Sequence, residues 1–279
     1  MLAKKIIRTM FTCKQLSFSY RPGKTVIDDL SLEIGEGLFY GIMGPNGCGK
    51  TTLIDLLAGH LSPRTGEIVL KGRRLGDFSK RELAREIALV PQFYNINFPY
   101  TAREIVMMGR YPHLPRFAAL GREEMERVER VMAETGTLEL AERPVTELSG
   151  GERQRVVFAR ALVQETPVLF LDEATANLDI NHTLNLLALV KEKINEKKLT
   201  VIAVFQDMNL AATFCDRLIL LNNGRVELEG AIERVLAPDA LAEVFGVEAR
   251  TYRDPFFNRH RVICGIPGSG TTQPAEKFH

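Results

Sequence analysis

A glycine-rich segment that ends in lysine and threonine is the strongest chemical signal in the sequence. It fits the spacing Gly-x-x-x-x-Gly-Lys-Thr over residues 44–51, between an apolar run at 38–43 and a helix expected from Lys50 to about Ala58. Glycines let such a loop wrap around phosphates, and the start of the helix adds a favourable dipole. A chance glycine-rich turn would not have this strand and helix context. The sequence therefore predicts a phosphate-binding loop (P-loop) made of Gly44, Pro45, Asn46, Gly47, Cys48, Gly49, Lys50, Thr51 and Thr52.

Two groups in this loop and two acids far along the chain supply the chemistry of a nucleotide site. Lys50 is expected to reach the β- and γ-phosphates, and the Thr51 hydroxyl to ligate magnesium. The apolar run at 168–171 ends in Asp172 and Glu173. Asp172 is expected to hold magnesium, and Glu173 to orient and deprotonate a water molecule. Such a pair is more often a solvated strand end, but the P-loop upstream favours the catalytic interpretation.

A second anion-binding element is predicted where a helix starts near Glu152. The segment Leu-Ser-Gly-Gly-Glu-Arg-Gln at 148–154 brings the hydroxyl of Ser149 and the backbone N–H groups of Gly150 and Gly151 to that helix start. One chain thus carries two helix ends suited to phosphate. Cys48 in the P-loop is either a small residue that fits or a thiol whose pKa is lowered by its surroundings.

The elements that must position these residues alternate along the chain. Apolar runs expected to be strands occur at 38–43, 87–90, 168–171, 200–205 and 218–221, with helices between most of them. Strands that alternate with helices indicate a mostly parallel sheet, so the predicted fold class is α/β. Strands with turns are expected from Phe11 to Val69, apart from the helix after the P-loop. The stretch 93–149 is expected to be entirely helical, with a capping box at Thr101 and Glu104.

Composition narrows the classes of protein further. The chain has 279 residues, and its net charge of +1 gives no electrostatic footprint for nucleic acid, which is not an expected partner. Its four cysteines form no CxxC pair, which argues against a zinc site and a disulfide framework and favours a reducing cytoplasm. No apolar run approaches the roughly 18 residues of a spanning helix, and no secretory signal is expected.

The P-loop, the segment 148–154 and the acidic strand end occur in an order and spacing that resemble the ATP-binding subunits of ABC transporters, over about residues 11–250. This resemblance implies ATP and magnesium as cofactors and hydrolysis of ATP. It also implies a head-to-tail homodimer, in which Ser149, Gly150 and Gly151 of one copy close over ATP held by the P-loop of the other.

Further positions match the family pattern. The resemblance implies that Gln92 is the Q-loop residue at the magnesium and reaction centre, that Asp179 is the catalytic D-loop residue, and that Tyr20 stacks on adenine. The alternatives are a polar loop residue for Gln92 and core packing for Tyr20, which alternates with Leu16 and Phe18 along one strand.

The resemblance implies a P-loop NTPase fold of RecA-like type. Its mostly parallel sheet core is expected to carry an N-terminal antiparallel β subdomain and an inserted helical subdomain. The expected divisions are 1–95 for the first part of the ATPase core, 96–150 for the helical subdomain, 151–235 for the second part of the core, 236–264 for a C-terminal extension and 265–279 for a flexible tail.

Two positions depart from the family pattern. Ala174 stands where proline is usual after the catalytic glutamate, and Gln206 stands where a switch histidine is expected. A glutamine amide can still donate a hydrogen bond to a γ-phosphate oxygen, but it cannot take a proton or become cationic as imidazole can. Slower hydrolysis is therefore expected.

Segments at 108–114, 144–149 and 207–217 resemble importer ATPases for iron-siderophore, haem or cobalamin; manganese, zinc or molybdate remain alternative cargoes. The implied partners are a second copy, an integral-membrane permease and, indirectly, an extracytoplasmic substrate-binding protein. The implied location is the cytoplasmic face of the membrane. A soluble ABC ATPase outside transport and a weakly hydrolysing, nucleotide-gated subunit are the competing functions.

Aromatic residues between Phe93 and Tyr111 form the last predicted feature. They are Phe93, Tyr94, Phe98, Tyr100 and Tyr111, many for a short segment with polar flanks. They either line a groove for a permease helix or pack the core of the helical subdomain.

Overall fold

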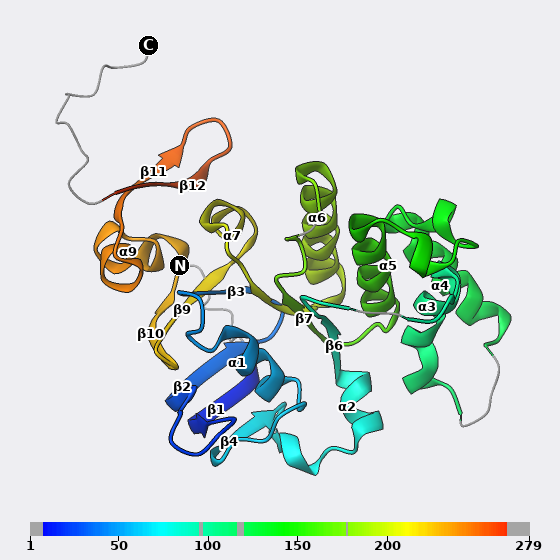
Figure 1. The fold of residues 1–279 in the computed structure, drawn as a ribbon, viewed down its shortest axis with the longest axis horizontal. Helices are drawn as coiled ribbons and strands as arrows, with labels where there is room; N and C mark the ends of the chain where they lie inside the picture. The colour runs from blue at the N-terminus through cyan, green and yellow to red at the C-terminus, as the bar shows by residue number, and fades with distance from the viewer. Residues whose placement is uncertain (1–7, 95–96, 116–119, 177, 267–279) are drawn as a thin grey trace, which may run out of the picture.

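Two β-sheets with a helix between them position the P-loop (Figure 1). In the computed structural model, which describes residues 8–94, 97–115, 120–176 and 178–266, strand β3 (Phe39–Met43) leads into the P-loop and helix α1 (Lys50–Leu57) leaves it. Figure 1 shows α1 between the larger sheet and the N-terminal sheet, while α5 (Gly150–Val163), α6 (Ile180–Lys197) and α7 (Met208–Phe214) lie on the opposite side of the larger sheet.

The larger sheet confirms the predicted parallel core. Its six strands run in the order β10-β9-β3-β8-β7-β6, and every neighbouring pair is parallel except β10 with β9. Because the five strands from β9 to β6 in this order are parallel, residues after their carboxyl ends meet at one edge of the sheet although they are distant in the sequence. Besides β3 the strands are β6 (Ile87–Val90), β7 (Val168–Asp172), β8 (Thr200–Val204), β9 (Arg217–Asn222) and β10 (Arg225–Gly230).

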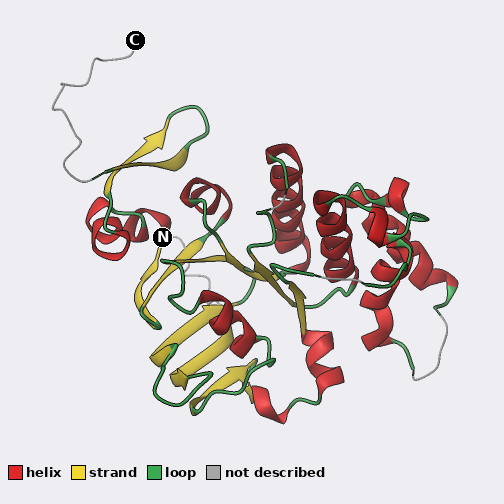
Figure 2. Cartoon of the chain, viewed as in Figure 1, coloured by secondary structure: helices red, strands yellow, loops and turns green. Residues whose placement is uncertain are grey.

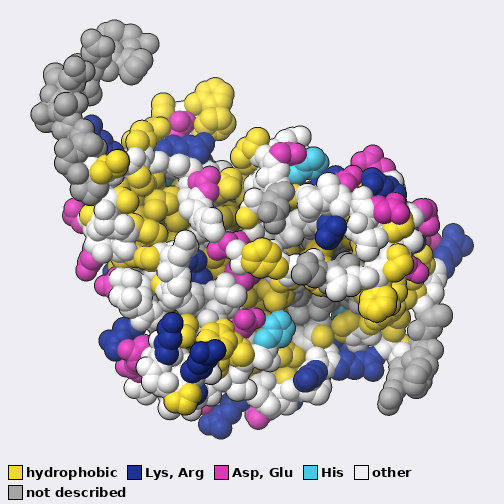
Figure 3. All heavy atoms as spheres, in the orientation of Figure 1, with side chains coloured by type: hydrophobic (Ala, Val, Ile, Leu, Met, Phe, Trp, Pro, Cys, Tyr) yellow, Lys and Arg dark blue, Asp and Glu magenta, His cyan; other side chains and the backbone are white. Residues whose placement is uncertain are grey.

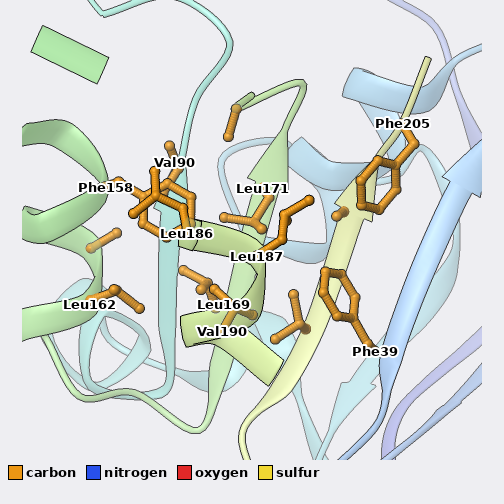
Figure 4. Close-up of a cluster of buried hydrophobic side chains, with 14 of the residues drawn as sticks. Phe39, Val90, Phe158, Leu162, Leu169, Leu171, Leu186, Leu187, Val190 and Phe205 are labelled. Atoms are coloured by element: carbon orange, nitrogen blue, oxygen red, sulfur yellow. The ribbon is translucent and has the colours of Figure 1, made fainter. Parts of the chain in front are cut away.

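Both faces of this sheet are buried, which explains its continuous apolar runs. Leu169 and Leu171 of β7 face one side, where they pack with Phe158 of α5 and Leu187 of α6 (Figure 4). Phe170, between them, faces the other side and belongs to the cluster around α1. Side chains that alternate along a strand thus join two hydrophobic cores, and a polar residue inside either would be costly.

The N-terminal strands form a separate antiparallel sheet, as predicted. Its order is β2-β1-β4-β5, and β1 pairs antiparallel with both β2 and β4. One face packs against α1 in the second core cluster. The strands are β1 (Thr9–Phe18), β2 (Ile27–Gly35), β4 (Thr65–Leu70) and β5 (Arg73–Arg74).

The segment between β6 and α5 is less helical than predicted (Figure 2). Prolines and glycines interrupt it, so long helix appears only where neither occurs. The capping box at Thr101 and Glu104 is confirmed at the start of α3, and Ser79 caps α2 in the same way. Before β6 lie η1 (Leu75–Asp77), a 3-10 segment, and α2 (Lys80–Glu86). Between β6 and α5 the α-helices are α3 (Ala102–Met107) and α4 (Arg122–Glu134), and the 3-10 segments are η2 (Met108–His113), η3 (Leu138–Leu140) and η4 (Val145–Glu147).

The chain after β10 forms two short helices and a hairpin. These are α8 (Ile232–Val235), α9 (Pro238–Phe245), β11 (Glu248–Asp254) and β12 (Arg259–Gly265). Gly265, predicted to open the flexible tail, instead ends β12, and residues 267–279 of that tail lie outside the described residues. Nowhere in the described ranges does a helix have the length and apolar character needed to cross a membrane.

Candidate functional site

The P-loop requires glycine where it leaves β3 and where it enters α1. Gly44 has a φ of +154°, and a Cβ there would lie 2.0 Å from the carbonyl oxygen of Leu221. Gly49, at the N-cap of α1, has a φ of +107°, and its Cβ would lie 3.0 Å from the carbonyl oxygen of Val26. Backbone carbonyl groups of β9 and of the residue just before β2 (Ile27–Gly35) therefore shape the loop, while Asn46 and Gly47 at its tip are exposed.

Lys50 is buried, and its ammonium group is turned onto its own loop. Nζ donates hydrogen bonds to the carbonyl oxygens of Gly44 and Pro45, both at 2.9 Å. An ammonium group has three donors, so one remains beyond these two contacts. Neither bond is to a carboxylate, so the cation is available to a phosphate that enters the loop.

Thr51 and Asp172, the two residues expected to hold magnesium, lie within hydrogen-bonding distance of each other. The Thr51 hydroxyl donates to Asp172 Oδ1 at 3.3 Å, and Asp172 is buried at the end of β7. Burial raises the pKa of Asp172 to about 6, and the charges of Glu173 and Asp55 act in the same direction, against the hydrogen bond from Thr51. A buried carboxylate beside other carboxylates fits a divalent cation, which prefers oxygen ligands.

Glu173 lies between two amides that come from neighbouring strand ends. Gln92, after β6, and Gln206, after β8, each donate from Nε2 to Glu173 Oε2 at 2.6 Å. The sequence thus predicted three residues that the fold brings together. Glu173 has a φ of +47°, unusual for a residue other than glycine, and such strain clusters at functional sites.

Tyr20 is not a core residue. Strand β1 ends at Phe18, so the strand face shared with Leu16 does not continue, and Tyr20 is 58% exposed. Its hydroxyl lies 3.2 Å from the Thr52 hydroxyl oxygen at the start of α1, and its ring meets Phe18 edge-on with centroids 5.0 Å apart. The core-packing alternative is therefore wrong, and an aromatic ring stands exposed beside the P-loop.

Ser149 and the two glycines begin α5 at the protein surface. Ser149 forms a capping box with Glu152, and Ser149 and Gly150 are exposed. A Cβ added to Gly150 would meet no atom within 4 Å, so the approach to this helix start is open. Asp179 in turn caps α6: its carboxylate accepts from the His182 N–H at 2.8 Å and contacts His182 Nδ1 at 2.7 Å.

Gln154 makes a contact near the site that the sequence did not predict. It lies one turn into α5, is buried, and donates from Nε2 to the carbonyl oxygen of Ala174 at 3.0 Å. It therefore joins the helix that begins at Ser149 to the turn that carries Glu173. A glutamine at an otherwise apolar position of a buried helix was the available signal, because buried polar groups need partners.

Cys48 is buried, and desolvation raises the pKa of its thiol, although Lys50 opposes the shift. The structure thus favours the packing role over the reactive one.

We expect a maleimide at neutral pH to label Cys48 slowly with or without ATP, since the thiolate is the reacting form. Cys264, which is exposed, is the internal control and should label quickly. Rapid labelling of Cys48 that ATP prevents, measured by mass spectrometry of peptides, would support the reactive thiol instead.

The family model for ABC transporters matches residues 27–176, more than half of the chain. The chain belongs to the ABC transporter family. It is 41% identical over 233 residues to the cobalamin import ATP-binding protein BtuD of Halobacterium salinarum, covering 84% of this chain and 58% of that protein. The chain therefore spans little more than half the length of that relative.

Other members of the ABC family match over most of their length. The ferric enterobactin transport ATP-binding protein FepC of Escherichia coli is 38% identical over 243 residues, covering 87% of this chain and 89% of FepC. Among solved structures, the dimeric ATP-binding cassette MJ0796, in a post-hydrolysis state bound to ADP and Pi, superposes with a TM-score of 0.72. It is 30% identical and covers 80% of this chain and 99% of that one.

Gln206, which contacts Glu173, stands where the family resemblance predicts a histidine. We expect Gln206→His to raise ATP turnover by about tenfold, or about 1.4 kcal/mol in the barrier. Imidazole can become cationic and strengthen its contact as charge develops, whereas the amide can only donate. Affinity for ATP should change little, because the stronger contact would be made in the transition state and not in the ground state. Steady-state turnover at saturating ATP measures this, and an unchanged or lower rate would mean that the site has adapted to glutamine.

Proposed function

We propose that this chain is the ATP-binding and ATP-hydrolysing subunit of an ABC importer for a metal chelate of the iron-siderophore, haem or cobalamin class. The observation that carries the enzymatic part is the pair of amides, from Gln92 and Gln206, on one oxygen of Glu173. They hold the carboxylate at the edge of the sheet where the P-loop and Asp172 also lie. A site that only bound nucleotide would not need this arrangement.

In this proposal Glu173 orients a water molecule and takes its proton as the water oxygen attacks the γ-phosphorus. The bond from that phosphorus to the bridging oxygen breaks, leaving ADP and phosphate. Lys50 turns from its loop carbonyls to the β- and γ-phosphates. Thr51, Asp172 and Gln92 are the residues that would hold magnesium, which neutralises phosphate charge when bound.

The partner for the exposed start of α5 is proposed to be a second copy of this chain. Ser149, Gly150 and Gly151 offer a hydroxyl and backbone N–H groups, and none of Ser149's hydrogen bonds given by the described residues leaves its own turn. A head-to-tail pair with two-fold symmetry would bring this helix start over the partner's P-loop and complete two sites. The dimeric form of the MJ0796 cassette supports this arrangement.

Exposed aromatics support a further partner, an integral-membrane permease to which this chain would bind at the cytoplasmic face of the membrane. Phe93, Phe98, Tyr100 and Tyr111 are between 42% and 77% exposed, whereas Tyr94 packs under the Arg160 guanidinium at 4.2 Å from its ring centre. Large exposed apolar side chains gathered in one segment mark interaction surfaces. The name of BtuD supports import and that of FepC supports transport, and cobalamin and ferric enterobactin are within the proposed class of cargo.

The decisive experiment is purification of the tagged chain from native membranes. A polytopic permease should copurify, and a cysteine replacing Asn97 or Thr101 should crosslink to it. An associated substrate-binding protein would then narrow the cargo. Recovery only as a soluble protein with cytosolic partners would overturn the importer and leave a soluble ABC ATPase.

Gln206 is the reason for a second candidate function, a nucleotide-gated subunit that hydrolyses ATP very slowly. Its amide completes the contacts of Glu173 but cannot carry a proton. A turnover assay with the permease present separates the two: repeated release of phosphate supports the enzyme, and a single slow turnover supports the gated subunit.

A further inference from the structure

The hairpin at the end of the described chain is attached to the helix that follows Gln206. Asn209, in the first turn of α7, donates from Nδ2 to the carbonyl oxygen of Val262 at 3.2 Å. Its Oδ1 accepts from the N–H of Val262 at 2.9 Å. One amide therefore takes both backbone hydrogen-bonding groups of one residue of β12, as a neighbouring strand would. Only a side chain with both a donor and an acceptor can do this.

The rest of the hairpin is held from one side. Ala249 of β11 and Val262 of β12 are buried in the same core cluster as Ala211 of α7. The tip projects, and hydrophobic side chains stand out there (Figure 3); Phe256 is 86% exposed. A two-stranded hairpin is marginally stable alone, so its position depends on this packing and on Asn209.

The turn that carries Gln206 is fixed at two points. Before it, the N–H of Phe205 donates to the carbonyl oxygen of Ile42 at 3.1 Å, which continues the pairing of β8 with β3. After it, Asp207 caps α7 and accepts from the N–H of Asn209 at 2.7 Å. The side chain of Gln206 is exposed between these points and reaches Glu173 at 2.6 Å.

Helix α7 is too short to keep its place without tertiary contacts. It has seven residues, and isolated helices below about 12 residues are marginal in water. The position of its first turn therefore depends on the groups that contact it, and Asn209 in that turn is hydrogen-bonded to the hairpin.

We propose that Asn209 is a positioning residue for ATP hydrolysis: by clamping α7 to β12, it makes the C-terminal hairpin a support for the turn that aims Gln206 at Glu173. The inference rests on the hydrolytic function proposed above. It adds an element, β11 and β12, that lies outside residues 27–176 and far from the P-loop in sequence.

The test is steady-state ATP turnover by the full chain with Asn209→Leu, which keeps a similar size and loses both hydrogen bonds. We expect kcat to fall about three- to tenfold, the effect of losing a hydrogen bond or two, with KM for ATP within about twofold. Asn209→Asp keeps the bond from the Val262 N–H and should lose less. It also serves if the leucine variant does not fold.

The decisive comparison repeats Asn209→Leu in a Gln206→Ala background. If Asn209 acts through Gln206, the change should then have little further effect on kcat, since coupled residues are not additive. Thr213→Val is the matched control: it removes the 2.6 Å bond from the Thr213 hydroxyl to the Asn209 carbonyl oxygen within the same helix and should leave kcat unchanged.

Three outcomes are informative. Equal loss in both backgrounds would mean that Asn209 only stabilises the fold, and an unchanged kcat for Asn209→Leu would overturn the inference outright. A wild-type chain that shows no turnover at all, even with its permease, would instead overturn the proposed hydrolysis itself.

Discussion

Replacing Glu173 with glutamine should lower ATP turnover by about a hundred- to ten-thousandfold, the usual contribution of a positioned general base. The replacement has nearly the same shape, and its side-chain oxygen can still accept the hydrogen bonds that Gln92 and Gln206 donate to Oε2. The site therefore keeps its arrangement and loses the group that takes the proton. Affinity for ATP should stay within about threefold, since the lost interaction belongs to the reacting state.

The same variant should collect as an ATP-bound dimer. If two copies close head to tail over ATP, a chain that binds but does not hydrolyse ATP remains closed. Size-exclusion chromatography with saturating ATP measures the dimer, and release of labelled phosphate measures turnover. Glu192→Gln removes the same charge from an exposed position on α6 and is the matched control.

Two results would count against this account. A Glu173→Gln chain that stays monomeric at saturating ATP and high protein concentration would remove the support for head-to-tail closure. A variant with nearly normal turnover would show that another group takes the proton, and Asp172 would become the first residue to examine.

The parallel core could be predicted because burial on both faces leaves a plain trace in the sequence. The strands β3, β7 and β8 are buried throughout, so each reads as a nearly continuous apolar run, and the polar residues at or after their ends are easy to recognise. The types of the site residues were therefore available from the sequence. Hydrophobic alternation in β1 was predicted too, but the point where it ends, before Tyr20, was not.

The arrangement around Glu173 could not be predicted in the same way. Gln92 is 81 residues from Glu173 and Gln206 is 33 residues from it, so their convergence on one oxygen depends on the register of β6, β7 and β8. The positive φ of Glu173 has no signal in its residue type. Family resemblance named these residues, but only the sheet shows that the two amides share one acceptor.

The C-terminal hairpin escaped prediction because its pattern is weak. Exposed apolar and charged residues mix on its outer face, and its inner face buries little beyond Ala249 and Val262. Such short strands take their position from the rest of the fold. Here the packing of Ala249 and Val262 and the amide of Asn209 in α7 set that position, and these are long-range contacts that no local propensity encodes.

Replacing Lys50 with alanine should weaken ATP binding by about a hundredfold or more, in contrast to Glu173→Gln. Loss of one partner of a desolvated charge pair costs on the order of 2–5 kcal/mol, and here the phosphates would lose the ammonium group of Lys50. Nζ now donates to the carbonyl oxygens of Gly44 and Pro45. A phosphate can take their place as the acceptor, and in the alanine variant water can donate to the two carbonyl oxygens. Isothermal titration with ATP and magnesium measures the change in affinity.

The controls separate charge from packing, because Lys50 is buried along most of its length. Lys50→Met keeps an apolar stem of similar length and should lose as much affinity as alanine while remaining better folded. Lys14→Ala removes the same charge from an exposed pair with Glu67 on the N-terminal sheet and should bind ATP normally. If Lys50→Met bound ATP almost as well as the parent chain, the loop's backbone N–H groups and helix dipole would be holding the phosphates without the lysine. The ammonium group would then act mainly in the transition state, and its loss should lower kcat.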